Sequence, residues 1–312
     1  MADVFTFGET MARLTGVNIG PLRFSGHLSM GIAGAESNFA IGMARLGDDV
    51  AWTGRVGDDE FGRLIAGILR AEGVQAHGIV DDEAPTGLLI KNKRTRSNTE
   101  VAYYRAHSAG SRLAASDLDH DAIARARVLH LTGITPALSG TAREACFAAV
   151  ETATAAGVTV SFDFNMRRKL WSEAEAAPVL RDLARRADIV FASDDEARIV
   201  VDGETNSDLA RGIAALGPRE VVIKLGAGGA LGLADDTLRA APVHVVEELD
   251  PVGAGDAFCA GYLHAYLAGG DLSARLDTGA RCGAYAVTVD GDWEGLPTLA
   301  ELEQSGGDDV LR

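Results

Sequence analysis

The chain has 312 residues, 47% hydrophobic and 24% charged, which suits one large α/β domain with a full core or two small domains. Its formal net charge of −16 argues against nucleic acid or an anionic membrane as partner. There is no run of about 18 apolar residues and no signal peptide, and the three cysteines (Cys146, Cys259 and Cys282) lie far apart, so we expect a cytoplasmic protein without membrane spans, disulfides or a zinc site.

The first 80 residues predict strands of a main sheet, interrupted by one irregular segment. Residues 11–31 show no helical period and contain scattered glycines and Pro21, so we expect short strands and turns outside that sheet. A glycine-rich turn at 31–38 then leads into an expected helix. The other elements expected here are strands at 4–7, 49–54 and 75–80 and a helix from about 57 to 72.

Between residues 85 and 105 the pattern changes to strand-like runs at 87–91 and 100–105. A basic hairpin tip at 93–98 separates the two runs, and its charges are typical of a solvated sheet edge. Together with residues 11–31, these runs predict a second, smaller sheet.

From residue 128 onward, apolar strands alternate with helices of 10–15 residues. Strands are expected at 128–131, 158–163, 189–192 and 220–224. Helices are expected at 139–156, 173–186 and 273–289, and a further helix is expected to end near 217, before the last of these strands. This alternation predicts a parallel sheet covered on both faces, with sites beyond the C-terminal ends of its strands. Six polar or glycine residues fall at such positions: Asn165, Arg167, Ser193, Glu196, Lys224 and Gly226.

The stretch 250–256, Asp-Pro-Val-Gly-Ala-Gly-Asp, has the chemistry of an anion site. Two close glycines let backbone N–H groups approach an anion, and aromatic residues at helical spacing predict that a helix begins directly afterwards. The helix N-terminus adds unpaired donors, and Asp256 at its mouth could accept a hydroxyl proton. Alternatively, the stretch is a tight turn in which Asp256 caps the helix, and the motif alone does not decide between the two.

The same stretch resembles the C-terminal signature of the PfkB (ribokinase-like) carbohydrate kinases, although Pro251 stands where many members have threonine. The resemblance implies an α/β fold with a ribokinase-like, mostly parallel central sheet flanked by helices, and a small β-sheet lid. It implies a single kinase domain over 1–312, with lid segments at about 11–31 and 85–107. It also implies that Asp256 is the catalytic base and that Gly253, Ala254 and Gly255 form the anion hole with it.

Other stretches resemble the 2-keto-3-deoxygluconate kinase branch of this family: 33–38, 103–105 with 108–111, 162–171 and 291–295. This resemblance implies substrate-binding roles for Gly34, Asn38, Tyr103, Arg105, Arg167 and Asp292. An arginine offers a bidentate fork for a carboxylate, which neutral sugars lack. Taken alone, each residue also has a purely structural interpretation, as a local turn, a surface arginine on a strand, a basic loop or an ordinary acidic loop residue.

On the nucleotide side, the resemblance places Asn165 near the phosphates, and Ser193 and Glu196 at an element that acts near Mg²⁺ and phosphate. Ser193 stands where the family has asparagine, and it could equally cap a helix. The glycine turn after the 220–224 strand could meet the nucleotide through Lys224, Gly226, Gly228 and Gly229. It is not a Walker A loop, because the lysine precedes the glycines, and the glycine spacing does not fit a dinucleotide loop.

These resemblances imply ATP- and Mg²⁺-dependent phosphorylation of 2-keto-3-deoxygluconate, in sugar acid metabolism of the Entner–Doudoroff type. One alternative is a kinase of the same fold for a neutral sugar such as fructose or ribose. Another is a non-catalytic protein that binds sugar or nucleotide. Family analogy predicts a homo-oligomer assembled through the lid, while the preferred C4 epimer and any monovalent-cation requirement stay open. Residues 305–312 are expected to be a frayed tail.

Overall fold

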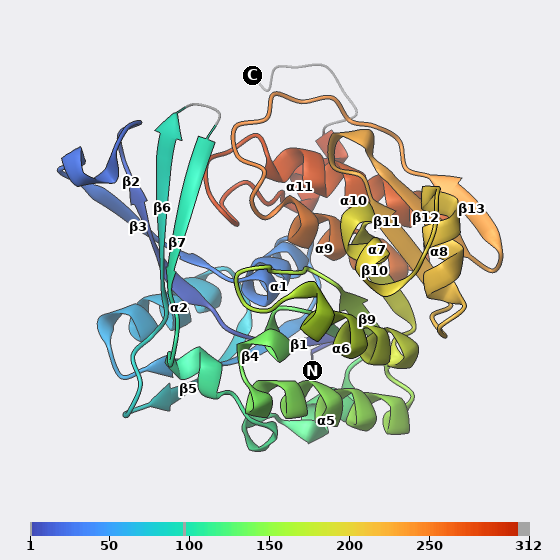
Figure 1. The fold of residues 1–312 in the computed structure, drawn as a ribbon, viewed down its shortest axis with the longest axis horizontal. Helices are drawn as coiled ribbons and strands as arrows, with labels where there is room; N and C mark the ends of the chain where they lie inside the picture. Colours follow the sequence, from blue (N-terminus) through green and yellow to red (C-terminus); the bar gives the residue numbers. More distant parts are fainter. Residues whose placement is uncertain (1, 96–97, 305–312) are drawn as a thin grey trace.

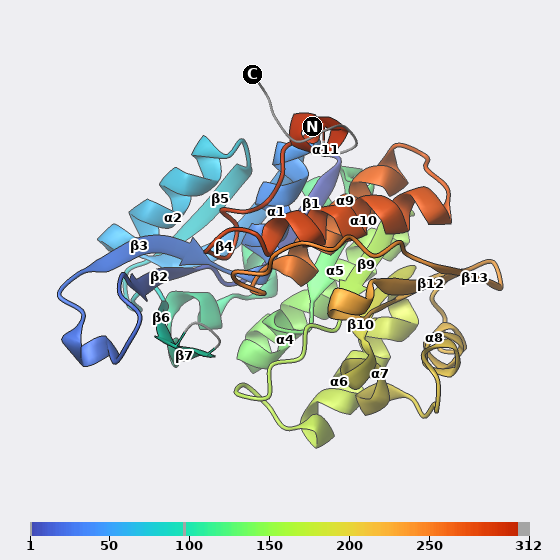
Figure 2. The ribbon, with the colours of Figure 1, turned by 90° about the horizontal axis from the view of Figure 1, so that it is seen from above.

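The computed structural model describes residues 2–95 and 98–304. Within these residues the chain forms a large sheet of nine strands, covered by helices on both faces, and a separate sheet of four strands (Figures 1 and 2). This is the α/β architecture expected from the sequence. Residues 96–97 of the expected hairpin tip, and the expected tail at 305–312, lie outside the described residues.

The large sheet is mostly parallel. Its strands run in the order β13 (Thr237–Ala240), β12 (Ala230–Ala234), β11 (Glu220–Lys224), β10 (Ile189–Ser193), β9 (Thr159–Asp163), β8 (Val128–Thr132), β1 (Val4–Phe7), β4 (Val50–Gly57) and β5 (Gln75–Asp81). Every neighbouring pair from β11 to β5 is parallel, whereas β12 and β13 pair antiparallel at one edge. The sequence predicted the parallel strands but did not predict this antiparallel hairpin.

Helices cover the two faces of the large sheet and bury a separate apolar cluster on each (Figure 2). One face carries α1 (Ala35–Arg45), α2 (Glu60–Ala71), α9 (Ala254–Leu267), α10 (Leu272–Ala286) and α11 (Leu299–Gln304). The other carries α3 (His120–Arg125), α4 (Thr135–Leu138), α5 (Gly140–Ala156), α6 (Glu173–Arg186), α7 (Asp194–Val200) and α8 (Asn206–Ala214). Short 3₁₀ turns are η1 (Leu22–Phe24), η2 (Ala109–Arg112), η3 (Ala115–Asp117) and η4 (Gly226–Gly228).

Local sequence signals explain where several helices start and stop. The hydroxyl of Ser139 accepts the Ala142 N–H and caps α5, and Gly157 ends that helix in a left-handed conformation with φ 72°. Helix α6 begins with a reciprocal capping box between Ser172 and Glu175. Helix α10 ends at Ala286, three residues before the expected end at 289.

The small sheet stands beside the large one, at the left of Figure 1. Its order is β3 (Leu28–Ala33), β2 (Met11–Gly16), β6 (Leu88–Thr95) and β7 (Asn98–Tyr104), with only the central β2–β6 pair parallel. It is therefore built from the two segments expected outside the main sheet, although the first of them extends to residue 33. A small apolar cluster of Met11, Ala33 and Leu89 covers one face, against which Tyr103 packs.

The three cysteines, Cys146, Cys259 and Cys282, are free thiols and buried. Burial raises the pKa of each thiol above its ordinary value. Among residues 2–95 and 98–304, no helix combines the length and apolar character needed to cross a bilayer.

Candidate active site

The N-terminus of α9 begins in the Gly-Ala-Gly-Asp stretch. Gly253, rather than Asp256, is the N-cap, and it has a left-handed φ of 83°. A Cβ at Gly253 would lie 1.9 Å from the carbonyl oxygen of Asp292, so the close approach of two loops requires glycine here. Asp256 lies in the first turn of the helix, where the positive end of the helix dipole favours a negative charge.

The Asp256 carboxylate is held by two side-chain amides from distant elements. Nδ2 of Asn38, in α1, donates to Oδ2 at 2.9 Å, and Nδ2 of Asn165, after β9, donates to Oδ1 at 3.3 Å. Asn165 has a positive φ of 37°, which is uncommon for a residue other than glycine. Burial raises the pKa of Asp256 to about 7, although the hydrogen bond from Asn38 opposes the shift. This carboxyl can therefore take or release a proton near neutral pH.

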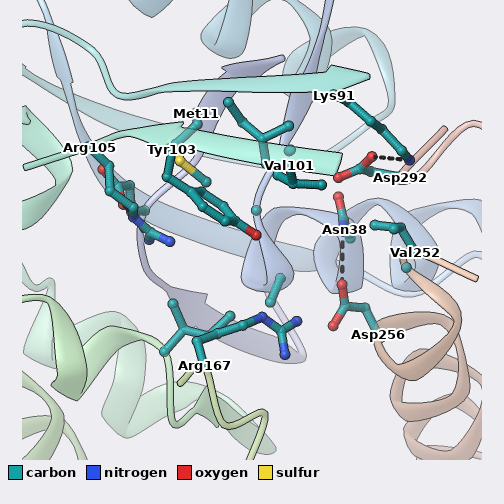
Figure 3. A pocket seen from close by; sticks show the side chains of 17 residues that line it. Met11, Asn38, Lys91, Val101, Tyr103, Arg105, Arg167, Val252, Asp256 and Asp292 are labelled. Atoms are coloured by element: carbon teal, nitrogen blue, oxygen red, sulfur yellow. Dashed lines mark hydrogen bonds and ion pairs between the residues drawn. The ribbon is translucent and has the colours of Figure 1, made fainter. Parts of the chain in front are cut away.

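A cavity of about 90 Å³ opens in front of Asp256, between the small sheet and the large one (Figure 3). The predicted residues that line it are Gly34, Asn38, Tyr103, Arg105, Arg167, Gly253, Asp256 and Asp292. All six predicted substrate-binding residues therefore meet at one cavity. It adjoins a larger hollow of about 1390 Å³, with which it shares Val101, Tyr103, Arg105 and Arg167.

Polar groups at this cavity differ in whether they already have partners. Arg105 is paired with Glu9, whose Oε2 accepts from Nε at 2.6 Å. By contrast, within the described residues Arg167 forms no ion pair, and its one hydrogen bond is to the Met166 carbonyl at 3.4 Å. Among the same residues, the buried Oδ1 of Asn38 lacks a hydrogen-bond partner. Arg167 and Asn38 are therefore available to a ligand.

Asp292 is engaged with side chains of the small sheet. Its carboxylate is bound by Arg13 of β2 at 3.0 Å and by Lys91 of β6 at 3.4 Å. Burial raises the pKa of Asp292, while both cations oppose the shift. Arg13 and Lys91 were not predicted from the sequence, because pairings with Asp292 across 279 and 201 positions leave no signal in a single sequence.

Beyond the cavity, Ser193 and Glu196 form the capping box of α7. Oε2 of Glu196 accepts the Ser193 N–H at 2.8 Å, and Oε1 accepts the Met166 N–H at 2.8 Å. The helix-capping role considered from the sequence is thus present. In addition, these contacts tie α7 to the loop that carries Arg167.

Lys224 ends β11 and binds Asp163 at the end of β9, with Nζ–O distances of 2.7 and 2.8 Å. Burial alone would lower the pKa of Lys224, but the acidic groups around it, first among them the Asp163 carboxylate, together raise that pKa. A Cβ at Gly255 would lie 3.3 Å from Nζ, so this ammonium lies beneath the start of α9. The neighbouring glycine turn, η4 with Gly229, bends back with positive φ at Gly226 (55°) and Gly229 (84°).

The family model for pfkB family carbohydrate kinases matches residues 1–299 of this chain. The chain belongs to that family. It is 37% identical over 306 residues to a 2-dehydro-3-deoxygluconokinase of Bacillus subtilis, which covers 96% of this chain and 94% of the relative. It is 34% identical over 311 residues to a 2-dehydro-3-deoxygalactonokinase of Haloferax volcanii, with 98% of each chain covered.

Among solved structures, this pfkB-family kinase resembles a fructokinase from Vibrio cholerae, solved with fructose, ADP and a calcium ion. The two are 27% identical, with a TM-score of 0.85, and the match covers 97% of this chain and 98% of the other. The expected family and fold class, a ribokinase-like α/β sugar kinase, are therefore confirmed. In the described part of the kinase, no group of three or more His, Cys, Asp or Glu side chains is arranged to hold a metal ion.

Proposed function

We propose that this kinase transfers the γ-phosphoryl group of ATP to the terminal hydroxyl of 2-keto-3-deoxygluconate (named 2-dehydro-3-deoxygluconate in its relatives). The observation that carries the proposal is the cavity that combines the buried Asp256 carboxylate with the Arg167 guanidinium, which forms no ion pair among the described residues. The carboxylate can deprotonate a hydroxyl at one end of a substrate, while the guanidinium binds an acid group at the other end. The names of the Bacillus and Haloferax relatives, both kinases for 2-dehydro-3-deoxy sugar acids, support the same substrate class.

Asp256 takes the proton of the attacking hydroxyl in this mechanism. Its pKa of about 7 matches a base that must be ionised before the reaction and protonated after it. The backbone N–H groups of Gly253, Ala254, Gly255 and Asp256 stabilise the charge that develops on the transferring phosphoryl group. They are at the first turn of α9 and lack helical partners there, although the Ala254 N–H also donates to the Pro251 carbonyl at 3.4 Å.

The nucleotide lies on the side of Asp256 that is formed by the ends of β9, β10 and β11. In this proposal, Lys224 and the glycines 226, 228 and 229 hold its phosphates. Asn165 lies near the phosphates and also orients Asp256 through its hydrogen bond. The described residues form no cluster of acidic side chains that could hold a metal ion. The side chains present therefore fit Mg²⁺ held through phosphates and water, near Ser193 and Glu196. Held there, Mg²⁺ would offset the negative charge of the phosphates.

The acid end of the substrate meets Arg167 and Tyr103, which point toward the cavity in Figure 3. Arg105 also binds the acid group, with its guanidinium shared between Glu9 and the substrate. Oδ1 of Asn38, which has no partner among the described residues, accepts a hydrogen bond from a sugar hydroxyl. Gly34 keeps the entry to α1 close to the small sheet, because a Cβ there would lie 2.6 Å from the Glu9 carbonyl oxygen. Asp292 forms part of the wall of this cavity.

The small sheet acts as a lid on a single kinase domain, and the molecule assembles through it. Six large apolar side chains on the small sheet and its loops are exposed: Val17, Ile19, Phe24, Leu28, Met30 and Tyr104. A second copy of the chain would bury them. Light scattering tests this, since Phe24→Asp should lower the molar mass of the oligomer and a monomeric wild type would refute it.

The experiment that tests the function measures ADP release from ATP and Mg²⁺ with 2-keto-3-deoxygluconate, its C4 epimer, fructose and ribose. Turnover of the sugar acid that is lost in Asp256→Asn would support both substrate and base. A preference for fructose or ribose would refute the substrate and keep the mechanism. No turnover with any sugar, despite binding, would favour a non-catalytic binding protein.

A further inference from the structure

A buried cluster of charged side chains joins the small sheet to two loops near α9. Arg13 of β2 binds Asp292 at 3.0 Å and Glu294 at 2.5 Å. Lys91 of β6 forms an ion pair with Asp250 and lies 3.4 Å from Asp292. The Lys91 side chain is 2% exposed, and Asp250 and Asp292 are 1% and 5% exposed, so these three charges are shielded from water, whereas Glu294 is 30% exposed.

Both acidic partners of Lys91 belong to loops that shape the anion hole. Asp250 lies three residues before Gly253, and its two oxygens accept the N–H groups of Val252 and Gly291, each at 3.3 Å. Asp292 presents its carbonyl oxygen to Gly253 at the close approach described above. The Lys91 ammonium therefore bridges the loop that starts the anion hole and the loop that supports it from behind.

The lid supplies the positive charges of this cluster, and the large part of the molecule supplies the negative ones. Asp250, Asp292 and Glu294 are three carboxylates, whereas the cations facing them are Lys91 and Arg13. Buried carboxylates are costly without a paired cation. The arrangement of the two loops therefore depends on the lid lying against them, which gives lid closure a direct physical link to the anion hole.

We propose that Lys91 is a positioning residue for phosphoryl transfer. Its ammonium holds the Asp250 and Asp292 loops together, so that the N–H groups of Gly253 to Asp256 face the transferring phosphoryl group only while the lid is closed. The proposal rests on the kinase function proposed above. It assigns Lys91 a role in kcat rather than in holding the sugar.

The test compares Lys91→Met with Lys93→Met. Lys93 lies two residues further along the same strand and pairs at 2.6 Å with Asp290, at the start of the Asp292 loop. Asp290 is 56% exposed and neither residue lines the cavity, so this pair is a solvent-exposed link between the same two segments. We expect Lys91→Met to lower kcat about 100-fold with less than a threefold change in KM for ATP or the sugar acid. Lys93→Met should stay within threefold of wild type, and Lys91→Arg should recover most of kcat.

Three results would overturn the proposal: equal effects of the two methionine variants, a loss confined to KM, or a kcat of Lys91→Met within threefold of wild type. Since Lys91→Met leaves the buried Asp250 carboxylate without its cation, while Asp292 keeps Arg13, a double variant, Lys91→Met/Asp250→Asn, separates folding from positioning. We expect its unfolding temperature to return toward wild type while kcat stays low, and recovery of kcat in it would show a purely structural role. Wild-type inactivity with every sugar would instead refute the kinase function and this role with it.

Discussion

Nδ2 of Asn38 lies 2.9 Å from Oδ2 of Asp256, although 218 positions separate the two residues in the chain. The contact joins α1 to α9, which pack side by side on one face of the large sheet. A donor at this distance favours the ionised carboxylate and so lowers the pKa that burial raises. A residue of α1 therefore helps to set the pKa of Asp256, which lies in the last third of the chain.

Replacing Asn38 should shift the pH dependence of the reaction. Asn38→Ala removes a hydrogen bond that lowers the pKa of Asp256, so that pKa should rise above about 7. Because the base must be ionised, the acid limb of kcat/KM should move to higher pH. Steady-state rates between pH 5 and 9 measure the shift. An acid limb at the same pH as in the wild type would show that Asn38 does not influence the pKa of the base.

Loss of the carboxylate at position 256 should abolish most turnover. General-base catalysis contributes roughly 10²- to 10⁴-fold to the rate, so Asp256→Asn should lower kcat by about that factor or more. The nucleotide should still bind, because the N–H groups at the start of α9 remain. Calorimetric titration with ATP and Mg²⁺ provides this control. A variant with near-normal kcat would remove Asp256 from the role of base.

The same substitution should stabilise the fold at high pH. The pKa of Asp256 is raised from 3.8 to about 7 in the folded state, so its protonated form contributes stability below pH 4, which is lost as the pH rises through 7. Above pH 7 the wild type carries a buried charge that Asp256→Asn lacks. We expect the variant to be more stable there by a few kcal/mol, with the difference vanishing near pH 4. Urea unfolding at pH 4 and pH 8 measures both values.

Replacing Arg167 should damage turnover of a sugar acid more than that of a neutral sugar. A hydrogen-bonded charge contributes about 1.5–3 kcal/mol, so Arg167→Met should lower kcat/KM for the acid roughly 10- to 100-fold. Turnover of fructose, however slow, should change much less. Arg168→Met is the matched control, because Arg168 is 64% exposed and paired with Glu173. Equal losses for acid and fructose would contradict a carboxylate-binding role.

A side chain at Gly253 should be incompatible with the loop arrangement. Gly253→Ala combines a positive φ of 83° with a Cβ position 1.9 Å from the Asp292 carbonyl oxygen. Gly269→Ala has a similar φ of 78° but no atom within 4 Å of its Cβ position, so it measures the backbone cost alone, about 1 kcal/mol. Gly253→Ala should lose far more stability or activity than Gly269→Ala. Comparable unfolding temperatures and rates would contradict the requirement for close approach.

The sequence predicted the alternating strands and helices because their apolar periods are long and regular. It did not predict the β12–β13 hairpin, since Asp235 and Asp236 occupy its turn with φ of 46° and 60°, where a glycine would have provided the usual signal. The Gly-Ala-Gly-Asp stretch located the start of α9, and the family motifs brought Asn38 and Arg167 to the same cavity. Their exact partners could not be predicted: the Lys91–Asp250 pair spans 159 positions and exists only once the small sheet is placed. The roles of Ser193 and Glu196 at the nucleotide remain predictions.

The buried cysteines make this protein a convenient subject for site-specific labelling. A thiol reacts with maleimide as its thiolate, and each of the three thiols is both enclosed and held in its protonated form. A single new cysteine at an exposed position of the small sheet, such as Thr99→Cys on β7, would therefore take up a fluorophore without removal of the native ones. The fluorescence of such a label would show in solution, in an otherwise unaltered chain, whether the small sheet moves as nucleotide and sugar are added.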